Sequence, residues 1–90
     1  MFEKVKKALR ITRYELEDDI KLAINAALLE LERVGVDVKS ENELITTAVI
    51  LYCWYYFDFR NKGESYYAAF GALRDSLSVS SAYTGGEKHE

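Results

Sequence analysis

Proline is absent from this chain of 90 residues, and cysteine, histidine and tryptophan occur once each. Because every peptide bond keeps its N–H, nothing in the composition interrupts a long helix. A single cysteine, Cys53, cannot form an internal disulfide, so a secreted disulfide-stapled domain is not expected and a reducing cytoplasm is favoured. The single histidine, His89, lies in a polar tail, which argues against a Ser–His or Cys–His catalytic pair.

The sequence also lacks the motifs that carry cofactor chemistry. No cluster of cysteine and histidine has zinc spacing, and there is no Walker loop or dinucleotide-binding fingerprint. Cys53 lies inside an apolar run, where a small core residue is a better interpretation than a nucleophile. We therefore predict a protein that is not an enzyme, with no catalytic residue, no cofactor and no metal.

Apolar runs long enough to cross a membrane are missing as well. The longest, residues 44–57, falls short of the about 20 residues that a spanning helix needs. The basic start of the chain, MFEKVKKALRITR, is not followed by the apolar core of a signal peptide. Its own apolar side is thin, so we predict no membrane partner.

Apolar side chains are abundant: 49% of the residues are hydrophobic, more than the core of so small a domain readily buries. Their spacing predicts helices over residues 2–10, 12–34, 43–59 and 64–77. Capping boxes are expected at Thr12 and Ser40, and Gly35 is expected to end the second helix in a left-handed conformation. The predicted fold class is all-α, a small bundle of about four helices over residues 1–77, followed by a flexible tail over residues 78–90.

Each predicted helix has an apolar stripe that would face a common core. The stripes are Phe2, Val5 and Leu9 on the first helix; Leu16, Ile20, Ala23, Ile24, Ala27, Leu31 and Val34 on the second; Leu44, Ala48, Leu51 and Tyr55 on the third; and Tyr66, Phe70, Leu73 and Leu77 on the fourth.

The second and third helices carry further apolar residues outside these stripes. A surface helix of a monomer should be polar there, and a helix that is apolar nearly all round must be enclosed. A central position in the bundle explains most of the third helix, and a partner surface explains the surplus. We therefore predict a subunit interface that contains Leu22, Ala26, Leu29, Ile50 and Trp54.

Charge is distributed unevenly along the chain. The net charge is −3, yet residues 1–13 hold five basic residues and one acidic residue. Such a segment suits a nucleic acid, a membrane surface or an acidic protein, or it is a solvated helix face. The acidic run of Glu17, Asp18 and Asp19 is favoured by the dipole at a helix start as a solvated face, with a carboxylate or metal site as the alternative.

The order of segments is more informative than any one of them. VKKALRIT leads into the acidic helix start ELEDDIKLAINAALLEL, then GVDV, a polar loop, ELITTAVILYCWYYF and a closing LRDSLSVSSAY. The markers within these segments are LRIT, EDDI, LI..AVILY and L..SLS..S.Y. On them, residues 5–83 resemble the tailed-phage head–tail connector family, the small head-completion adaptors of phages and prophages.

The resemblance implies a structural protein of the virion head–tail interface, assembled in the cytoplasm of the host bacterium. It implies a homo-oligomeric ring of about a dozen copies beneath the portal protein. The ring would extend the channel for double-stranded DNA, without binding it specifically, and would join the head to the next completion protein or the tail. The residues expected to face the channel are Glu15, Glu17, Asp18 and Asp19, and those expected on an arm toward the portal or another partner are Val79 and Tyr83.

Two other classes of protein fit parts of the pattern. A small helical interaction module, dimeric and regulatory, would also need a surplus apolar stripe but would form no ring. A compact DNA-binding domain is disfavoured by the acidic balance and by the lack of a basic recognition helix. The size of the assembly discriminates among the three classes.

Overall fold

The computed structural model describes residues 1–11, 14–39 and 42–80, and within these ranges the chain is helical with no strand. Two single turns of 3₁₀ helix, η1 (Tyr14–Leu16) and η2 (Phe59–Asn61), precede the second and fourth α-helices. The α-helices are α1 (Phe2–Leu9), α2 (Glu17–Arg33), α3 (Glu43–Tyr56) and α4 (Gly63–Ser78). The predicted all-α fold is therefore confirmed in this part of the chain.

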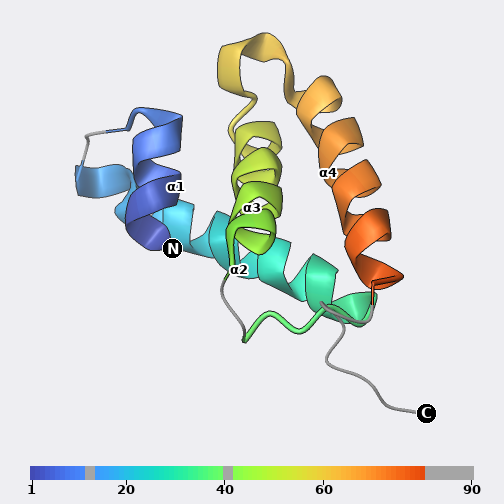
Figure 1. Ribbon diagram of the computed structural model, residues 1–90. Coiled ribbons are helices and arrows are strands. Elements are labelled where there is room, and N and C mark those ends of the chain that lie inside the picture. Colours follow the sequence, from blue (N-terminus) through green and yellow to red (C-terminus); the bar gives the residue numbers. More distant parts are fainter. Residues whose placement is uncertain (12–13, 40–41, 81–90) are drawn as a thin grey trace.

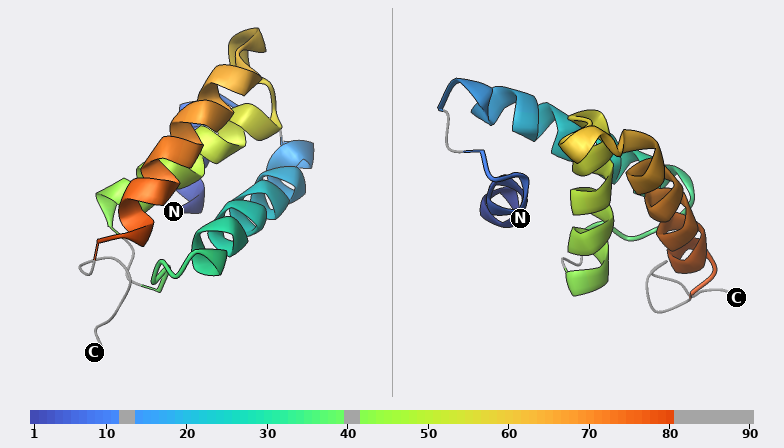
Figure 2. Two further views of the ribbon diagram at one scale, coloured as in Figure 1. Left: turned by 90° about the vertical axis from the view of Figure 1, so that its right-hand side faces the viewer. Right: turned by 90° about the horizontal axis from the view of Figure 1, so that it is seen from above.

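The four helices are arranged around α3. α3 and α4 form an antiparallel hairpin, and α2 crosses behind it (Figure 1). α1 packs against both α2 and α3. Seen from above, in the right panel of Figure 2, α1 and α3 lie on the same side of α2. In the described part of the chain, no helix packs against the far side of α2.

The end of α2 follows from Gly35, as predicted. Gly35 has a φ of 92°, a conformation that costs glycine little. Its N–H donates to the Glu32 carbonyl at 2.9 Å, and the Val36 N–H donates to the Leu31 carbonyl at 3.1 Å. These two bonds form a Schellman motif, and the buried side chains of Val36 and Leu31 complete its hydrophobic contact.

The helix starts differ from the predicted capping boxes, whose first residues, Thr12 and Ser40, lie outside the described ranges. The α-helical part of α2 begins only at Glu17, after η1. α3 begins at the predicted Glu43, but its N-cap is Asn42 rather than Ser40. The Asn42 Oδ1 accepts from the N–H of Leu44 at 3.0 Å and from that of Ile45 at 3.1 Å. Asparagine is as good a cap as serine, and it is the residue directly before the helix.

The turn between α3 and α4 shortens the predicted third helix by three residues. Asp58 is left-handed, with a φ of 49°, and its Oδ1 accepts from the Gly63 N–H at 2.9 Å. A Cβ at position 63 would lie 2.7 Å from that oxygen, so any larger residue would have to displace the hydrogen-bonded Asp58 side chain. The local hydrogen bond therefore ends α3 and begins α4 within a few residues.

The core confirms the predicted stripes on three helices and corrects the fourth. Its members from α1, α2 and α4 are Val5 and Leu9; Ile20, Ala23, Ile24, Ala27 and Leu31; and Phe70 and Leu77. On α3 the buried residues are Ile45, Thr46, Ala48, Val49 and Cys53. Leu44 and Tyr55, predicted to be core, are instead 43% and 39% exposed. Because α3 is apolar on nearly every side, its periodicity does not indicate which side faces inward.

We expect Asn42→Ala to destabilise the domain by about 1 kcal/mol, because two backbone N–H groups at the start of α3 lose their acceptor. Asn42→Asp keeps an acceptor and serves as the matched control. Urea unfolding followed by circular dichroism measures both. Equal stability of the alanine and aspartate variants would contradict the capping role.

Candidate interaction surfaces

The outer face of α2 carries the first candidate surface. Leu22 and Leu29 are 59% and 63% exposed, and Ala26 between them is half-buried. Leu29 follows Leu22 by seven positions, which is about two helical turns, so the two leucines lie on one face, opposite the buried residues of the helix. Tyr14, at the start of η1, is exposed too. The predicted surplus stripe on this helix is therefore at the surface of the subunit.

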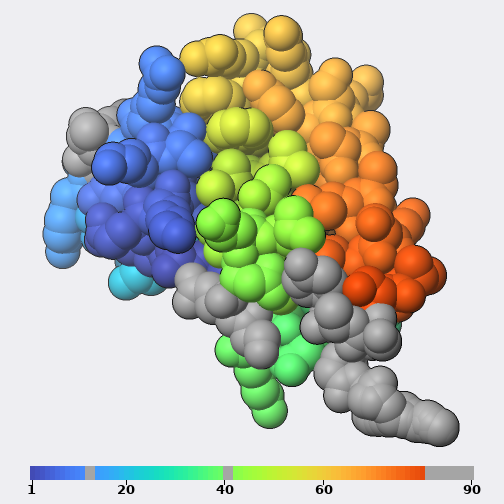
Figure 3. Space-filling model, viewed as in Figure 1, coloured from blue at the N-terminus to red at the C-terminus, as the bar shows by residue number. Residues whose placement is uncertain are grey.

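The open face of α3 is the second candidate surface. Leu44, Leu51 and Tyr55 step seven and four residues along the helix, so they share a face. Leu44 and Tyr55 are exposed, while Leu51 is half-buried. Figure 3 shows α3 at the surface of the molecule between α1 and α4. Leu44, Leu51 and Tyr55 were predicted to be core and lie instead at an apolar surface, whereas Ala48 of the same predicted stripe is buried.

Ile50 and Trp54, predicted at an interface, are both half-buried and pack against the core. The Trp54 Nε1–H donates to the Ala8 carbonyl of α1 at 3.2 Å. Its indole ring stacks on Phe59, with ring centroids 5.4 Å apart, and contacts Tyr66 of α4 at 4.9 Å. Trp54 therefore joins three parts of the subunit, and only its remaining exposed edge is open to a partner.

The acidic start of α2 does not form a single surface. Glu17 is half-buried and its Oε2 pairs with the Lys6 Nζ of α1 at 2.5 Å. The hydrogen bond to Glu17 raises the pKa of Lys6. Asp18 and Asp19 are exposed, as is Glu15 on η1. Successive residues of an α-helix point about 100° apart, so Glu17, Asp18 and Asp19 face three directions.

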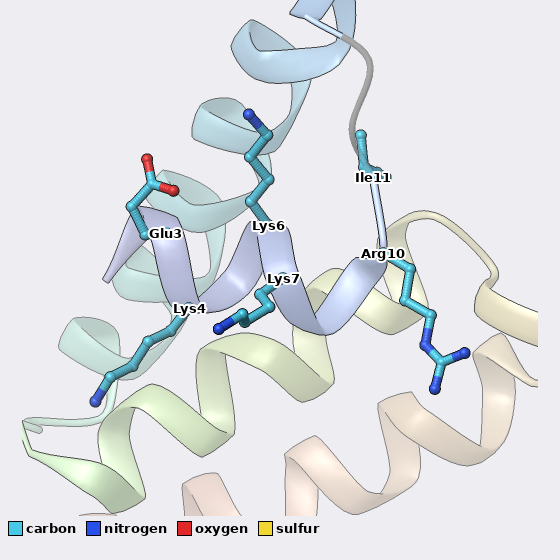
Figure 4. Close-up of a pocket in the computed structure, with 6 residues that line it drawn as sticks. All are labelled: Glu3, Lys4, Lys6, Lys7, Arg10 and Ile11. Atoms are coloured by element: carbon cyan, nitrogen blue, oxygen red, sulfur yellow. The ribbon is translucent and has the colours of Figure 1, made fainter.

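A basic strip runs along the exposed side of α1. It consists of Lys4 and Lys7 of α1 and of Arg10, the left-handed C-cap residue that follows the helix, and all three are exposed. The residues line an open hollow of about 480 Å³ together with Glu3, Lys6 and Ile11. Figure 4 shows the three side chains of the strip leaving α1 on the side away from Glu3 and Lys6. Among the described residues, no carboxylate pairs with any of the three.

Groups that could carry chemistry are few and shielded. Burial raises the pKa of the Cys53 thiol to about 12, so it is uncharged and unreactive near neutral pH. Burial also raises the pKa of Tyr52, whose ring contacts Phe70 edge-on at 5.1 Å. Within the described ranges, no three residues of the metal-binding types are grouped to hold an ion. In the same ranges, no helix has the length and apolarity to cross a bilayer.

The predicted partner arm begins at the end of α4. Val79 is the C-cap residue of that helix and is exposed. Tyr83, the second predicted residue of the arm, lies outside the described residues.

Several residues of these surfaces were missed in the sequence. The basic residues were recognised only as a charged segment, although the spacing of three between Lys4, Lys7 and Arg10 already predicts a common helix face. Tyr14 was missed because it was placed in the first turn of the second helix and was grouped with neither of the apolar stripes of that helix. The exposure of Leu44 could not be predicted from the sequence, because the periodicity of a helix that is apolar on nearly every side does not show which residues face solvent.

These features define a class of protein: a small helical subunit whose distinctive surfaces are apolar and charged faces. Comparison with protein families matches residues 1–83 to the phage connector protein family. The chain therefore belongs to the phage connector family, a family of structural proteins of the head–tail junction. Comparison with curated proteins and with solved structures found no match.

We expect Trp54→Ala to lower the free energy of unfolding by about 3 kcal/mol, because the indole fills space between α1, α3 and α4. Trp54→Phe should cost less, since it keeps one aromatic ring and loses the bond to Ala8 and only part of the volume of the indole. Leu29→Ala is the surface control and should stay within about 0.5 kcal/mol of the original chain. Chemical unfolding measures all three. A fully stable Trp54→Ala subunit would assign Trp54 to a partner interface alone.

Proposed function

We propose that this connector assembles into a closed ring of about a dozen copies at the head–tail junction of a phage or prophage particle. The ring extends the DNA channel below the portal protein and provides the attachment site for the next completion protein or the tail. The observation that supports this proposal is that a subunit of a connector family exposes two different apolar surfaces, one on α2 and one on α3. A monomer of this size has no use for either.

The chemistry of the two surfaces supports a ring over a pair. A two-fold dimer brings one patch against the same patch of the partner, and it needs a single self-complementary surface. A ring needs two different surfaces, because each copy contacts one neighbour on either side. α2 and α3 present such different surfaces, one aliphatic and one both aliphatic and aromatic.

The proposed interface has its centre on Leu22, Ala26 and Leu29. Ile50 and the exposed edge of Trp54 contribute at the border of α3, where both side chains are half-buried. Exposed leucines separated by full helical turns are suited to fit between side chains of a facing helix. The interface would thus bury apolar surface that the isolated subunit leaves in water.

The acidic set is proposed to contribute to the channel wall or its rim. Glu15 and Asp19 are exposed, Glu17 is half-buried against Lys6, and Asp18 is directed toward the outer face of α2. Carboxylates repel phosphates, which lets DNA pass without adhering. Placement of Asp19 on the outer circumference of an assembled ring would contradict this part of the proposal.

Leu29→Glu should remove the ring-sized species, because each contact would then bury a charge without a partner. Size-exclusion chromatography with light scattering, at rising protein concentration and with the portal protein added, measures the assembly. Ser76→Glu, at an exposed position of α4, is the matched control and should assemble normally. A dimer of the original chain would favour the regulatory module, and normal assembly of Leu29→Glu would remove α2 from the interface.

The tail supports attachment rather than folding in this proposal. We expect deletion of residues 79–90 to leave helicity and thermal unfolding nearly unchanged, since α4 ends at Ser78. The truncated subunit should bind portal protein more weakly, because Val79 and Tyr83 are the apolar anchors of the removed arm. Pull-down with the portal and particle yield measure the effect. Unchanged binding and yield would show that the arm has no partner there.

A further inference from the structure

The outer face of α2 combines apolar and acidic residues in one stripe. Asp18, Leu22 and Leu29 step four and seven residues along the helix, so they share a face. Asp18 and both leucines are exposed. Tyr14, one turn before Asp18, is exposed as well. This acidic–apolar stripe has its carboxylate at the N-terminal end and its leucines toward the C-terminal end.

The α1–α3 side of the molecule combines apolar and basic residues. The strip of Lys4, Lys7 and Arg10 lies on α1 with no carboxylate paired to it in the described ranges. α1 packs on α3 through the hydrogen bond from Trp54 to Ala8. Leu44 is exposed and Leu51 is half-buried on the open face of α3, and α3 lies on the same side of α2 as α1. This side therefore offers cations next to an apolar stripe.

We propose that the acidic–apolar stripe of α2 in one copy docks on the α1–α3 side of the next copy. Asp18 faces the strip around Lys7, and Leu22 and Leu29 cover the open face of α3. The proposal rests on the ring proposed above and names its repeated contact. The charges are opposite in sign, and apolar surface meets apolar surface.

The positions of the two surfaces, on opposite sides of the subunit, also determine the symmetry of the proposed assembly. The outer face of α2 points away from the side of that helix on which α1 and α3 lie. A contact between opposite sides is heterologous and repeats from copy to copy until the ring closes. Contacts between like surfaces would set lysine against lysine or aspartate against aspartate, and juxtaposed like charges are strongly unfavourable.

Charge reversal tests the pairing with the full chain. Lys7→Glu alone and Asp18→Lys alone should each weaken self-association at least about tenfold at low salt, because each places like charges together. An equimolar mixture of the two variants should assemble again, with the variants alternating, since each contact then pairs opposite charges. The double variant, with both changes in one chain, should also assemble. Light scattering measures size, and native mass spectrometry measures the ratio of the two variants.

Matched controls separate this contact from general charge effects. Lys62→Glu and Glu64→Lys make the same charge changes at exposed positions near the α3–α4 turn and should assemble like the original chain. Circular dichroism confirms that each variant is folded. Failure of both the mixture and the double variant to assemble, while the original chain does, would overturn the contact and leave the ring proposal standing. Absence of any assembly by the original chain, alone or on portal protein, would overturn both.

A nucleic-acid role for the basic strip is the competing outcome. Fluorescence anisotropy with a labelled DNA duplex at low salt tests it in the same variants. We expect no binding that depends on Lys7. Duplex binding that is lost in Lys7→Glu, together with normal self-association of that variant, would assign the strip to DNA and overturn the proposed contact.

Discussion

The packing of α3 against the other three helices is the constraint on which the rest of the structure depends. Ile45 and Val49 are fully buried in the common core, Trp54 reaches α1, and Tyr52 contacts Phe70 of α4. Burial of each large apolar side chain contributes about 1.5–3 kcal/mol. A chain of this length cannot surround α3 completely, so Leu44 and Tyr55 remain at the surface. The packing that folds the subunit therefore also leaves apolar side chains of α3 at its surface.

The charges have two separate roles that depend on the pairing of Lys6. Its ion pair with Glu17 joins α1 to the start of α2. Both groups retain access to water, so the pair adds little stability, and its main effect is to orient α1. With Lys6 directed toward α2, the strip of Lys4, Lys7 and Arg10 points outward on the other side. The ion pair inside the subunit, between Lys6 and Glu17, thereby determines which basic residues form the charged surface.

Local conformations at the turns set the angles between helices. Arg10, Asp58, Arg60 and Asn61 have positive φ values although none is glycine. Each such residue costs about 1 kcal/mol or more, which the surrounding contacts must offset. At Asp58 the hydrogen bond to Gly63 does so directly. At Arg10 the N–H bonds to Lys7 and the following Ile11 N–H bonds to Lys6, which closes α1.

The amino-acid sequence by itself determined the helical class, four helix positions, the stop at Gly35 and the core stripes of α1, α2 and α4. On α1 and α4 polar residues oppose apolar ones, and on α2 the core stripe is longer than the apolar stripe opposite it, so the period of 3.6 residues also gives the buried side. It also indicated the family, through the order of its segments. Only the tertiary structure decided which side of α3 faces inward, where Trp54 lies and which lysine is paired. Those features depend on contacts between helices, and a helix that is apolar all round carries no local signal for them.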